Sequence, residues 1–218
     1  MTFSYFDRQT MPYLENGPVL QKGLWYINLL PDGEGGISGR KADKITPITL
    51  PATESTMEVV ELDPKDHFIN IQGALTVLDD GYPVVMGYRR MNDEPYELTE
   101  LVSWKYYPGI TDWIPVVVDD GSSEGGFPWN VLPGMMNSEG GVVAVGLRNV
   151  NEVSQVVVYH SENDGDTWLP GVVSTDALHT VGFPVLAERS ASSQNLMFHV
   201  RNAFDYSDVR LKILSTSD

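Results

Sequence analysis

The apolar residues of this chain fall into short runs, and each run is bounded by residues that favour turns. Runs of roughly four to eight apolar or β-branched residues between Gly, Pro, Asn and Asp predict β-strands. No stretch shows the apolar spacing of a long amphipathic helix. The pattern therefore predicts an all-β chain, with clear strands over residues 23–30, 74–78, 83–88, 98–104, 112–118, 142–147, 155–160, 169–174, 195–200 and 209–214.

Several landmarks of this pattern recur at spacings of 53 to 58 residues. Arg90, Arg148 and Arg201 each stand just before the turn that follows a second strand, 58 and 53 residues apart. Ser103, Ser161 and Ser215 lie 58 and 54 residues apart, which equates these three serines as well. A period of about 50 residues with four strands in each unit is typical of β-propeller blades. We expect four-stranded antiparallel blades, about four of them visible and the last one incomplete, as a single domain or as part of a longer propeller, in the units 8–55, 66–120, 126–176 and 182–218.

The sharpest turn signal is the stretch from Ser161 to Trp168, which joins two predicted strands. Small polar residues and Gly165 allow the backbone to fold sharply, and a tryptophan can bury its ring beneath the turn. The stretch resembles the Asp-box (BNR repeat) of sialidase-like β-propellers, Ser-x-Asp-x-Gly-x-Thr-Trp, through Ser161, Asn163 in the aspartate position, Gly165, Thr167 and Trp168. The resemblance implies a structural role for these five residues, far from the active site of such propellers.

Three arginines at strand ends are the candidate ligand-binding residues. Arg148 and Arg201 stand at the same place in successive units, and Arg90 stands there in the unit before. Strand ends on one rim of a propeller surround its axis, so guanidinium groups repeated there suit a carboxylate, a sulfate or a hydroxyl-rich sugar. The resemblance to sialidases implies the same role, because arginines placed like Arg148 and Arg201 belong there to the clamp on the sialic acid carboxylate. The alternative is a structural pairing of these arginines with acids of a neighbouring blade.

Two aromatic residues and one acidic stretch complete the candidate set. Tyr106 and Tyr107 lie in a segment that we expect to be an exposed polar loop, where their rings would stack on sugar rings. Asp119 and Asp120 lie in a predicted crossing between units, where carboxylates could take part in glycoside chemistry. The full catalytic set of the sialidases is not visible, so a glycoside hydrolase activity stays uncertain and no catalytic residue is assigned.

Composition narrows the range of partners. Acidic residues outnumber Lys and Arg 30 to 14, and the formal net charge of −16 argues against nucleic acid and anionic membranes. No apolar run of about 18 residues is present, so membrane insertion is not expected, and no signal peptide is visible. The chain has no cysteine and four scattered histidines, so we expect no metal and no cofactor. Localisation is not determined, although the family resemblance favours an extracellular, virion or cell-surface setting.

Two functions from different classes remain open. The first is a carbohydrate-binding or glycan-hydrolysing protein of the sialidase-like group, in which rim arginines contact an anionic or hydroxyl-rich sugar. The second is a non-catalytic structural or interaction module, such as a subunit of a virion or surface assembly. The incomplete last unit and the acidic composition favour the second function, in which a protein partner or an oligomer would complete the last blade.

Overall fold

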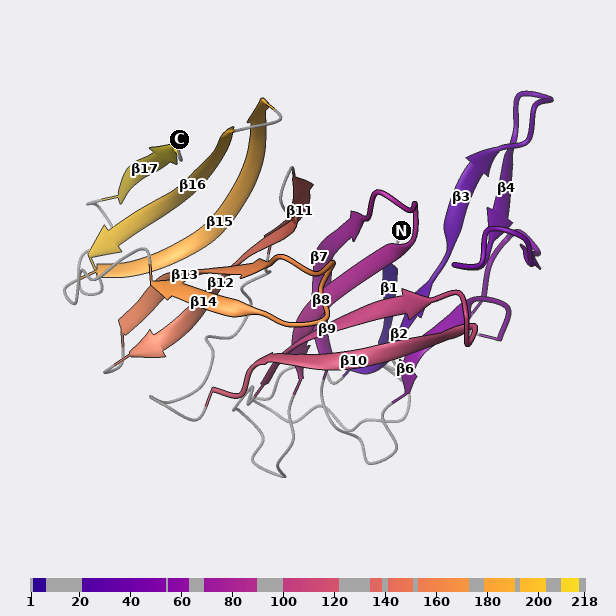
Figure 1. Cartoon of the computed structure of the whole chain (residues 1–218), viewed down its shortest axis with the longest axis horizontal. Coiled ribbons are helices and arrows are strands. Elements are labelled where there is room, and N and C mark those ends of the chain that lie inside the picture. Colours follow the sequence, from indigo (N-terminus) through magenta and orange to yellow (C-terminus); the bar gives the residue numbers. More distant parts are fainter. Residues whose placement is uncertain are drawn as a thin grey trace.

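The chain folds into β-strands, and their arrangement is seen in Figure 1. The computed structural model describes residues 2–6, 21–53, 55–62, 69–89, 100–121, 134–138, 141–150, 153–172, 179–190, 193–202 and 209–215. Every helix or strand assigned within these ranges is a β-strand, which confirms the predicted all-β class. Nowhere in the described residues is there a helix long and apolar enough to cross a membrane.

The strands form four successive antiparallel sheets and one small additional sheet. The first sheet has the order β1 (Thr2–Phe6), β2 (Gln21–Tyr26) and β6 (Glu58–Leu62). The second has the order β7 (Ile69–Val77), β8 (Pro83–Arg89), β9 (Glu100–Tyr107) and β10 (Asp112–Asp119). The third has the order β11 (Gly134–Ser138), β12 (Gly141–Val150), β13 (Val153–Ser161) and β14 (Leu169–Val172). The fourth has the order β15 (His179–Ser190), β16 (Ser193–Asn202) and β17 (Val209–Ser215).

The small sheet interrupts the first sheet between β2 and β6. It consists of β3 (Asn28–Pro31), β4 (Ile37–Arg40) and β5 (Pro47–Ile48). Lys44, in the loop before β5, places its ammonium group 4.0 Å from the centre of the Tyr82 ring and donates a hydrogen bond of 3.0 Å to the Asp80 carbonyl. These contacts hold the small sheet against the hairpin between β7 and β8.

Successive sheets meet through their innermost strands. β1 contacts β7, β7 contacts β11, and β11 contacts β15. Each of these strands is the first in the order of its own sheet, so the sheets fan out from a common line, as Figure 1 shows. Antiparallel sheets of three and four strands joined in this way are the blades of a β-propeller. The predicted propeller, with an incomplete last blade in the described residues, is therefore confirmed.

Each blade has two different ends because its neighbouring strands run in opposite directions. We call the end that carries the hairpins between first and second and between third and fourth strands the turn rim. Its described residues in the second and third sheets are 78–82, 108–111 and 162–168. The opposite end, where second strands finish and fourth strands lead to the next sheet, is the crossing rim. The crossing rim includes Arg89, Asp119 and Arg148, and the strand order places Arg201 there in the fourth sheet.

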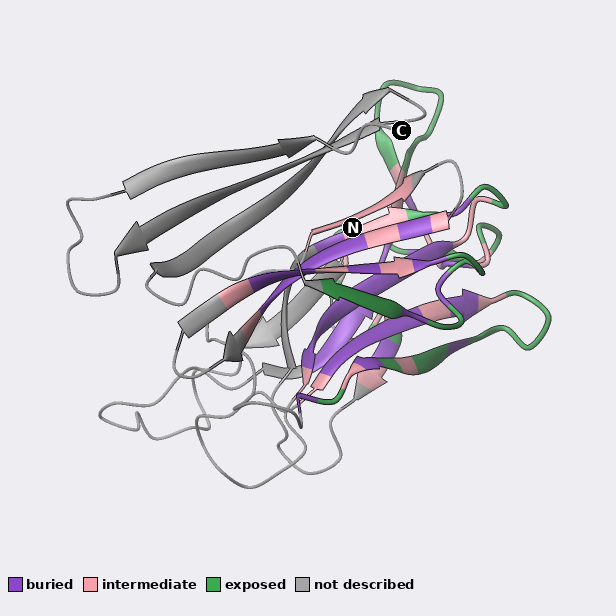
Figure 2. Ribbon diagram, turned by 60° about the vertical axis from the view of Figure 1, so that its left-hand side comes forward, coloured by how far each residue is buried: buried purple, intermediate pink, exposed green. Residues whose placement is uncertain are grey.

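Apolar side chains fill the two spaces between the first three blades. One core cluster joins the first and second sheets through residues such as Leu24, Val85 and Trp104, and the other joins the second and third sheets through residues such as Val84 and Tyr159. Val84 and Val85 are neighbours on β8 and point to opposite faces, and both are fully buried. Because both faces of the second sheet are covered, β8 is apolar at nearly every position and not at alternate ones (Figure 2).

The outermost strands of the second and third sheets each contain a proline. Pro115 of β10 lies opposite Trp104 of β9, and Pro170 of β14 lies opposite Tyr159 of β13. Proline has no backbone N–H and is tolerated on a strand that hydrogen-bonds on one side only. On β10 only Trp113 and Val118 are buried, and they belong to the two different core clusters on opposite faces of the second sheet.

Two details of the predicted repeat differ from the structure. The first blade is not confined to residues 8–55, because β1 and β6, on either side of that range, both pair with β2. The spacing argument also equated Ser103 with Ser161, but Ser103 lies in the middle of β9 whereas Ser161 ends β13. The position equivalent to Ser161 is Tyr107, at the end of the third strand, because the connection between the second and third strands covers residues 90–99 in the second sheet and only 151–152 in the third.

Candidate functional site

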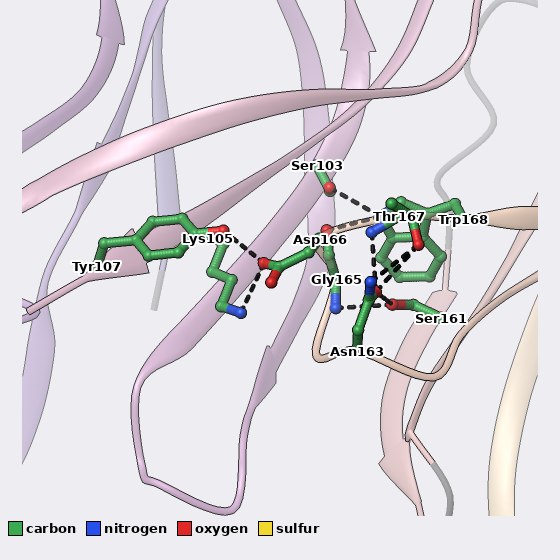
Figure 3. Close-up of polar contacts among 9 residues, drawn as sticks. All are labelled: Ser103, Lys105, Tyr107, Ser161, Asn163, Gly165, Asp166, Thr167 and Trp168. Atoms are coloured by element: carbon green, nitrogen blue, oxygen red, sulfur yellow. Dashed lines mark hydrogen bonds and ion pairs between the residues drawn. The ribbon is translucent and has the colours of Figure 1, made fainter.

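The turn between β13 and β14 is held by a closed set of hydrogen bonds around Asn163 (Figure 3). The Asn163 Oδ1 accepts hydrogen bonds from the Ser161 hydroxyl at 3.0 Å and from the Thr167 amide at 2.9 Å. The Ser161 hydroxyl oxygen in turn accepts a hydrogen bond of 2.8 Å from the Gly165 amide. Gly165 has a φ of 90°, in the region that favours glycine. Serine, an amide side chain and glycine at this spacing are therefore what the tight turn requires.

The same turn is anchored to β9 of the preceding blade. Trp168 is buried and donates its indole N–H to the Gly165 carbonyl at 3.1 Å and to the Ser103 hydroxyl at 3.0 Å. Asp166 accepts hydrogen bonds from Lys105 Nζ at 2.7 Å and from the Tyr107 hydroxyl. Figure 3 shows these two contacts to one side of the turn. All of these contacts are internal, so they support a structural role for the turn.

The Lys105, Tyr107 and Asp166 contact fixes the protonation of its members. Burial raises the pKa of Asp166, but the hydrogen bonds from Lys105 and Tyr107 outweigh it, and the pKa of Asp166 is lowered. Burial, followed by the bond to Asp166 and its charge, raises the pKa of Tyr107 to about 12. At neutral pH the phenol is therefore a donor and the carboxylate an acceptor.

On the crossing rim, Arg148 lies beside a buried carboxylate of the preceding blade. Its Nη2 is 3.7 Å from the Asp119 Oδ1, which is an ion pair too long for a hydrogen bond. Its Nε is buried and donates no hydrogen bond to any residue of the described chain. The Arg148 side chain retains 20% exposure, while Asp119 retains 8%. The Arg148 guanidinium therefore lacks part of its hydrogen bonding in this structure. An unmade hydrogen bond of a buried donor costs about 1–3 kcal/mol.

Asp119 is held by groups other than Arg148. The Tyr159 hydroxyl donates to the Asp119 Oδ2 at 2.8 Å, and the Gly121 amide donates to the Oδ1 at 2.9 Å. Tyr159 is fully buried. Burial, then the charge of Asp119 and the hydrogen bond to it, raises the pKa of Tyr159, so the phenol stays protonated. Asp119 therefore keeps its position whether or not Arg148 moves.

A second tyrosine connects the same two blades beside Arg148. The Tyr88 hydroxyl donates to the Leu147 carbonyl at 3.3 Å and accepts from the Leu147 amide at 3.1 Å. A Cβ atom at Gly146 would lie 2.9 Å from the Tyr88 oxygen, so only glycine leaves room for this hydroxyl. The backbone that carries Arg148 is thus held against the second blade by Tyr88.

The arginine at the end of β8 is in a different environment. Arg89 Nη1 is 2.8 Å from the Glu61 Oε1, and Arg89 Nη2 is 2.8 Å from the Glu100 Oε2. The other Glu61 oxygen accepts a hydrogen bond from the Trp104 indole N–H. Burial lowers the pKa of Arg89, but the hydrogen bonds and charges of Glu100 and Glu61 outweigh it, and the pKa is raised. Arg89 is therefore a structural link between the first two blades.

The remaining predicted site residues do not gather at one place. Arg90 lies outside the described residues, and of Arg201 the structure describes the backbone, which pairs with Val209 in β17. Tyr106 and Tyr107 end β9 and do not form an exposed loop, and Tyr106 is buried at 1% exposure. The expectation that both rings are exposed is wrong for Tyr106, since its ring packs against Trp113. Tyr107 belongs to the turn rim, opposite the rim of Arg148.

Sequence reasoning missed the partners of the arginines. Glu61, Glu100 and Tyr159 carry no motif, and Asp119 was expected in a crossing but is the last residue of β10. The sequence did carry a usable signal for these partners. An acid, Glu61 or Asp119, stands at or near the end of the strand that precedes the second and the third blade. No group of His, Cys, Asp or Glu that could hold a metal ion occurs among the described residues.

Comparisons with known proteins identify the fold of this chain but assign it to no family. No protein-family model matches the sequence, and a search of curated proteins found no match. An ulvan lyase of polysaccharide lyase family PL25, solved bound to -[GlcA(1-4)Rha3S]-, superposes with a TM-score of 0.67 at 10% identity, over 97% of this chain and 47% of that chain. A protein of unknown function from Dyadobacter fermentans gives a TM-score of 0.59 at 14% identity, over 91% of this chain and 56% of that chain.

A third solved structure is less similar. An α-L-arabinofuranosidase from Fusarium graminearum, in complex with an iminosugar inhibitor, gives a TM-score of 0.48 at 18% identity, over 66% of this chain and 45% of that chain. The two closer similarities, at 10% and 14% identity, show a shared fold alone. This chain spans about half the length of the ulvan lyase, at 47% of it.

Proposed function

We propose that this chain is a glycan-binding part of a sialidase-like β-propeller, and that Arg148 and Arg201 on the crossing rim contact an anionic or hydroxyl-rich sugar. The observation that carries the proposal is the state of Arg148, whose Nε is buried without a hydrogen bond to the described residues and whose only ion pair there is 3.7 Å long. Guanidinium donors in such a position suit the carboxylate, sulfate or hydroxyl oxygens of a sugar.

Two further facts support a sugar ligand. The ulvan lyase with the same fold is bound to a glucuronate and sulfated rhamnose unit, so this architecture can serve anionic glycans. With a net charge of −16, the chain repels most anions, and an arginine without full compensation is a local exception. The same proposal has two finer parts. One is that the turn from Ser161 to Trp168 is an Asp-box, and the other is that the protein cleaves glycosidic bonds.

The test is a binding screen on the intact chain. Uronate-bearing, sulfated, sialylated and neutral oligosaccharides are presented to the wild type and to Arg148→Ala and Arg201→Ala. We expect each variant to lose roughly tenfold or more in affinity, since a hydrogen bond to a charged group contributes about 1.5–3 kcal/mol. Hydrolysis of a sialoside substrate, measured in parallel, tests the sialidase interpretation.

A matched control is provided by Arg40→Ala. Arg40 lies on the small sheet and donates a hydrogen bond of 2.7 Å to the Ile45 carbonyl, away from the crossing rim. This variant should bind every probe as the wild type does. Undiminished binding in both rim variants would remove the arginine proposal. If the wild type binds none of the glycans, the alternative of a non-catalytic interaction module is favoured.

A further inference from the structure

Three blades carry an arginine among the last three residues of the second strand, but the residue opposite each arginine differs. Arg89 of β8 lies opposite Glu100, Arg148 of β12 lies opposite Gln155, and Arg201 of β16 lies opposite Val209. The cross-strand neighbour therefore changes from a carboxylate to an amide to an apolar side chain along the chain.

The outer strand of the preceding blade shows the same trend. It supplies Glu61 to Arg89 at 2.8 Å and Asp119 to Arg148 at 3.7 Å. From these two neighbouring strands, Arg89 thus receives two carboxylates, whereas Arg148 receives one at a longer distance.

We propose that Asp119 sets the charge of the Arg148 subsite, so that Arg148 recognises uncharged hydroxyl groups of a sugar and discriminates against its anionic groups. This inference rests on the proposed glycan-binding function. At 3.7 Å, Asp119 acts on Arg148 through its charge and forms no hydrogen bond with it. The donors of Arg148 thus stay available, but the net charge that an approaching anion meets is close to zero.

The geometry keeps Asp119 in this role when a ligand arrives. Both of its oxygens are already hydrogen-bonded, one by the buried Tyr159 and one by the Gly121 amide. Its 8% exposure makes it a fixed charge at the side of the subsite and not a group that turns away. A sulfate at Arg148 would lie beside a carboxylate and be repelled, whereas a hydroxyl oxygen would not. The ligand group expected at Arg148 is therefore a neutral, hydroxyl-rich part of a sugar.

The direct test uses inorganic sulfate as the probe and does not require a glycan. Sulfate is titrated at constant ionic strength into the wild type, Asp119→Asn and the double variant Asp119→Asn/Arg148→Ala, and binding is followed by NMR shifts. We expect Asp119→Asn to bind sulfate roughly tenfold more tightly than the wild type, because a like charge beside the anion is removed. The double variant should lose this gain. An unchanged sulfate affinity in Asp119→Asn, or a gain that survives in the double variant, would overturn the inference.

A second variant tests the inference from the opposite direction and leaves the Tyr159 contact intact. Gln155→Glu places a carboxylate opposite Arg148, as Glu100 is placed opposite Arg89. In the Asp119→Asn background it should remove the gain in sulfate affinity, and Gln155→Ser in the same background should not. Should Asp119→Asn not fold, Gln155→Glu is compared with Gln155→Ser in the wild type, where only the glutamate should weaken binding of a sulfated oligosaccharide. Equal effects of the two Gln155 substitutions would contradict the inference.

The two proposals fail in different ways. If no glycan binds the wild type but sulfate binding responds to Asp119 through Arg148, the glycan function is wrong and the charge role of Asp119 stands. If glycans bind through Arg148 but Asp119→Asn leaves the preference between sulfated and neutral probes unchanged, the charge role alone is wrong.

Discussion

The second and third blades are joined at both rims by polar clusters, and the two clusters differ in how far they are satisfied. At the turn rim, Asn163 and Trp168 have hydrogen-bond partners within the turn or on β9. At the crossing rim, Arg148 has a long ion pair and a buried Nε without a partner in the described chain. A closed set of contacts stabilises the fold and leaves nothing for a ligand, whereas an open one costs stability and is retained where a ligand completes it.

The largest effect should follow from breaking the closed cluster. Trp168→Ala removes a ring that is 9% exposed, together with its bonds to Ser103 and Gly165, and should lower the free energy of unfolding by about 3–5 kcal/mol. Urea denaturation measures this change. Leu169→Ala, at a neighbouring residue that is 68% exposed, is the matched control and should change stability by less than about 0.5 kcal/mol. A loss below about 1 kcal/mol for Trp168→Ala would show that the turn does not hold the blades together.

An intermediate effect should separate the two arginines of the crossing rim. Arg89→Met leaves the carboxylates of Glu61 and Glu100 without their shared partner, and the partial exposure of the cluster limits the expected loss to about 2–3 kcal/mol. Arg148→Met should cost less than about 1 kcal/mol, because Asp119 keeps its bonds to Tyr159 and Gly121. Thermal unfolding of the pair measures both changes. Equal losses would mean that Arg148 is as structural as Arg89.

The smallest effect concerns the exposed edge of the turn cluster. Lys105→Met removes an ion pair in which Asp166 is 44% exposed, so the loss at neutral pH should be below about 1 kcal/mol. Since the pKa of Asp166 is lowered in the folded protein, this contribution is present above the pKa of the unfolded state and disappears as the pH falls through the lower folded pKa. Unfolding of wild type and variant from pH 7 to pH 2 measures the difference.

Lys44→Met provides the control for that pH dependence. Lys44 contacts the Tyr82 ring and the Asp80 backbone carbonyl, and neither contact involves a carboxylate. The effect of Lys44→Met should therefore stay constant from pH 7 to pH 2. A Lys105→Met difference that is equally constant would show that the Asp166 charge contributes nothing.

The fold could be predicted because short apolar runs and turn residues are local properties. The predicted strands over residues 142–147 and 155–160, and the hairpin between β13 and β14, follow from the apolar pattern and from the turn chemistry of Gly165. The bounds of the first blade could not be predicted in the same way. The small sheet lies between β2 and β6 in the sequence, and its residues have the same pattern as the strands of a blade. The equation of Ser103 with Ser161 failed because connections of different length between the second and third strands shift the spacing without changing the topology.

The candidate site was less predictable because its residues are brought together across blades. The repeat identified Arg148 and Arg201 as equivalent, but nothing near Arg148 in sequence reveals that Asp119 faces it from the preceding blade. Tyr106 and Tyr107 are adjacent in sequence, and the two-residue alternation of a strand sends one into the core and the other to Asp166. Sequence patterns thus locate a side chain along its strand, while the neighbouring blade decides whether it is paired.

The prolines of the outermost strands have a consequence for how this protein meets other proteins. Pro115 and Pro170 each remove one N–H from an outer strand, β10 or β14, whose described partner lies on one side only. A strand from another molecule could not extend the sheet there with an unbroken ladder, so edge-to-edge aggregation is disfavoured at the perimeter. Recognition at that perimeter must therefore proceed through side chains, and concentrated solutions of the protein should resist the growth of β-rich fibrils.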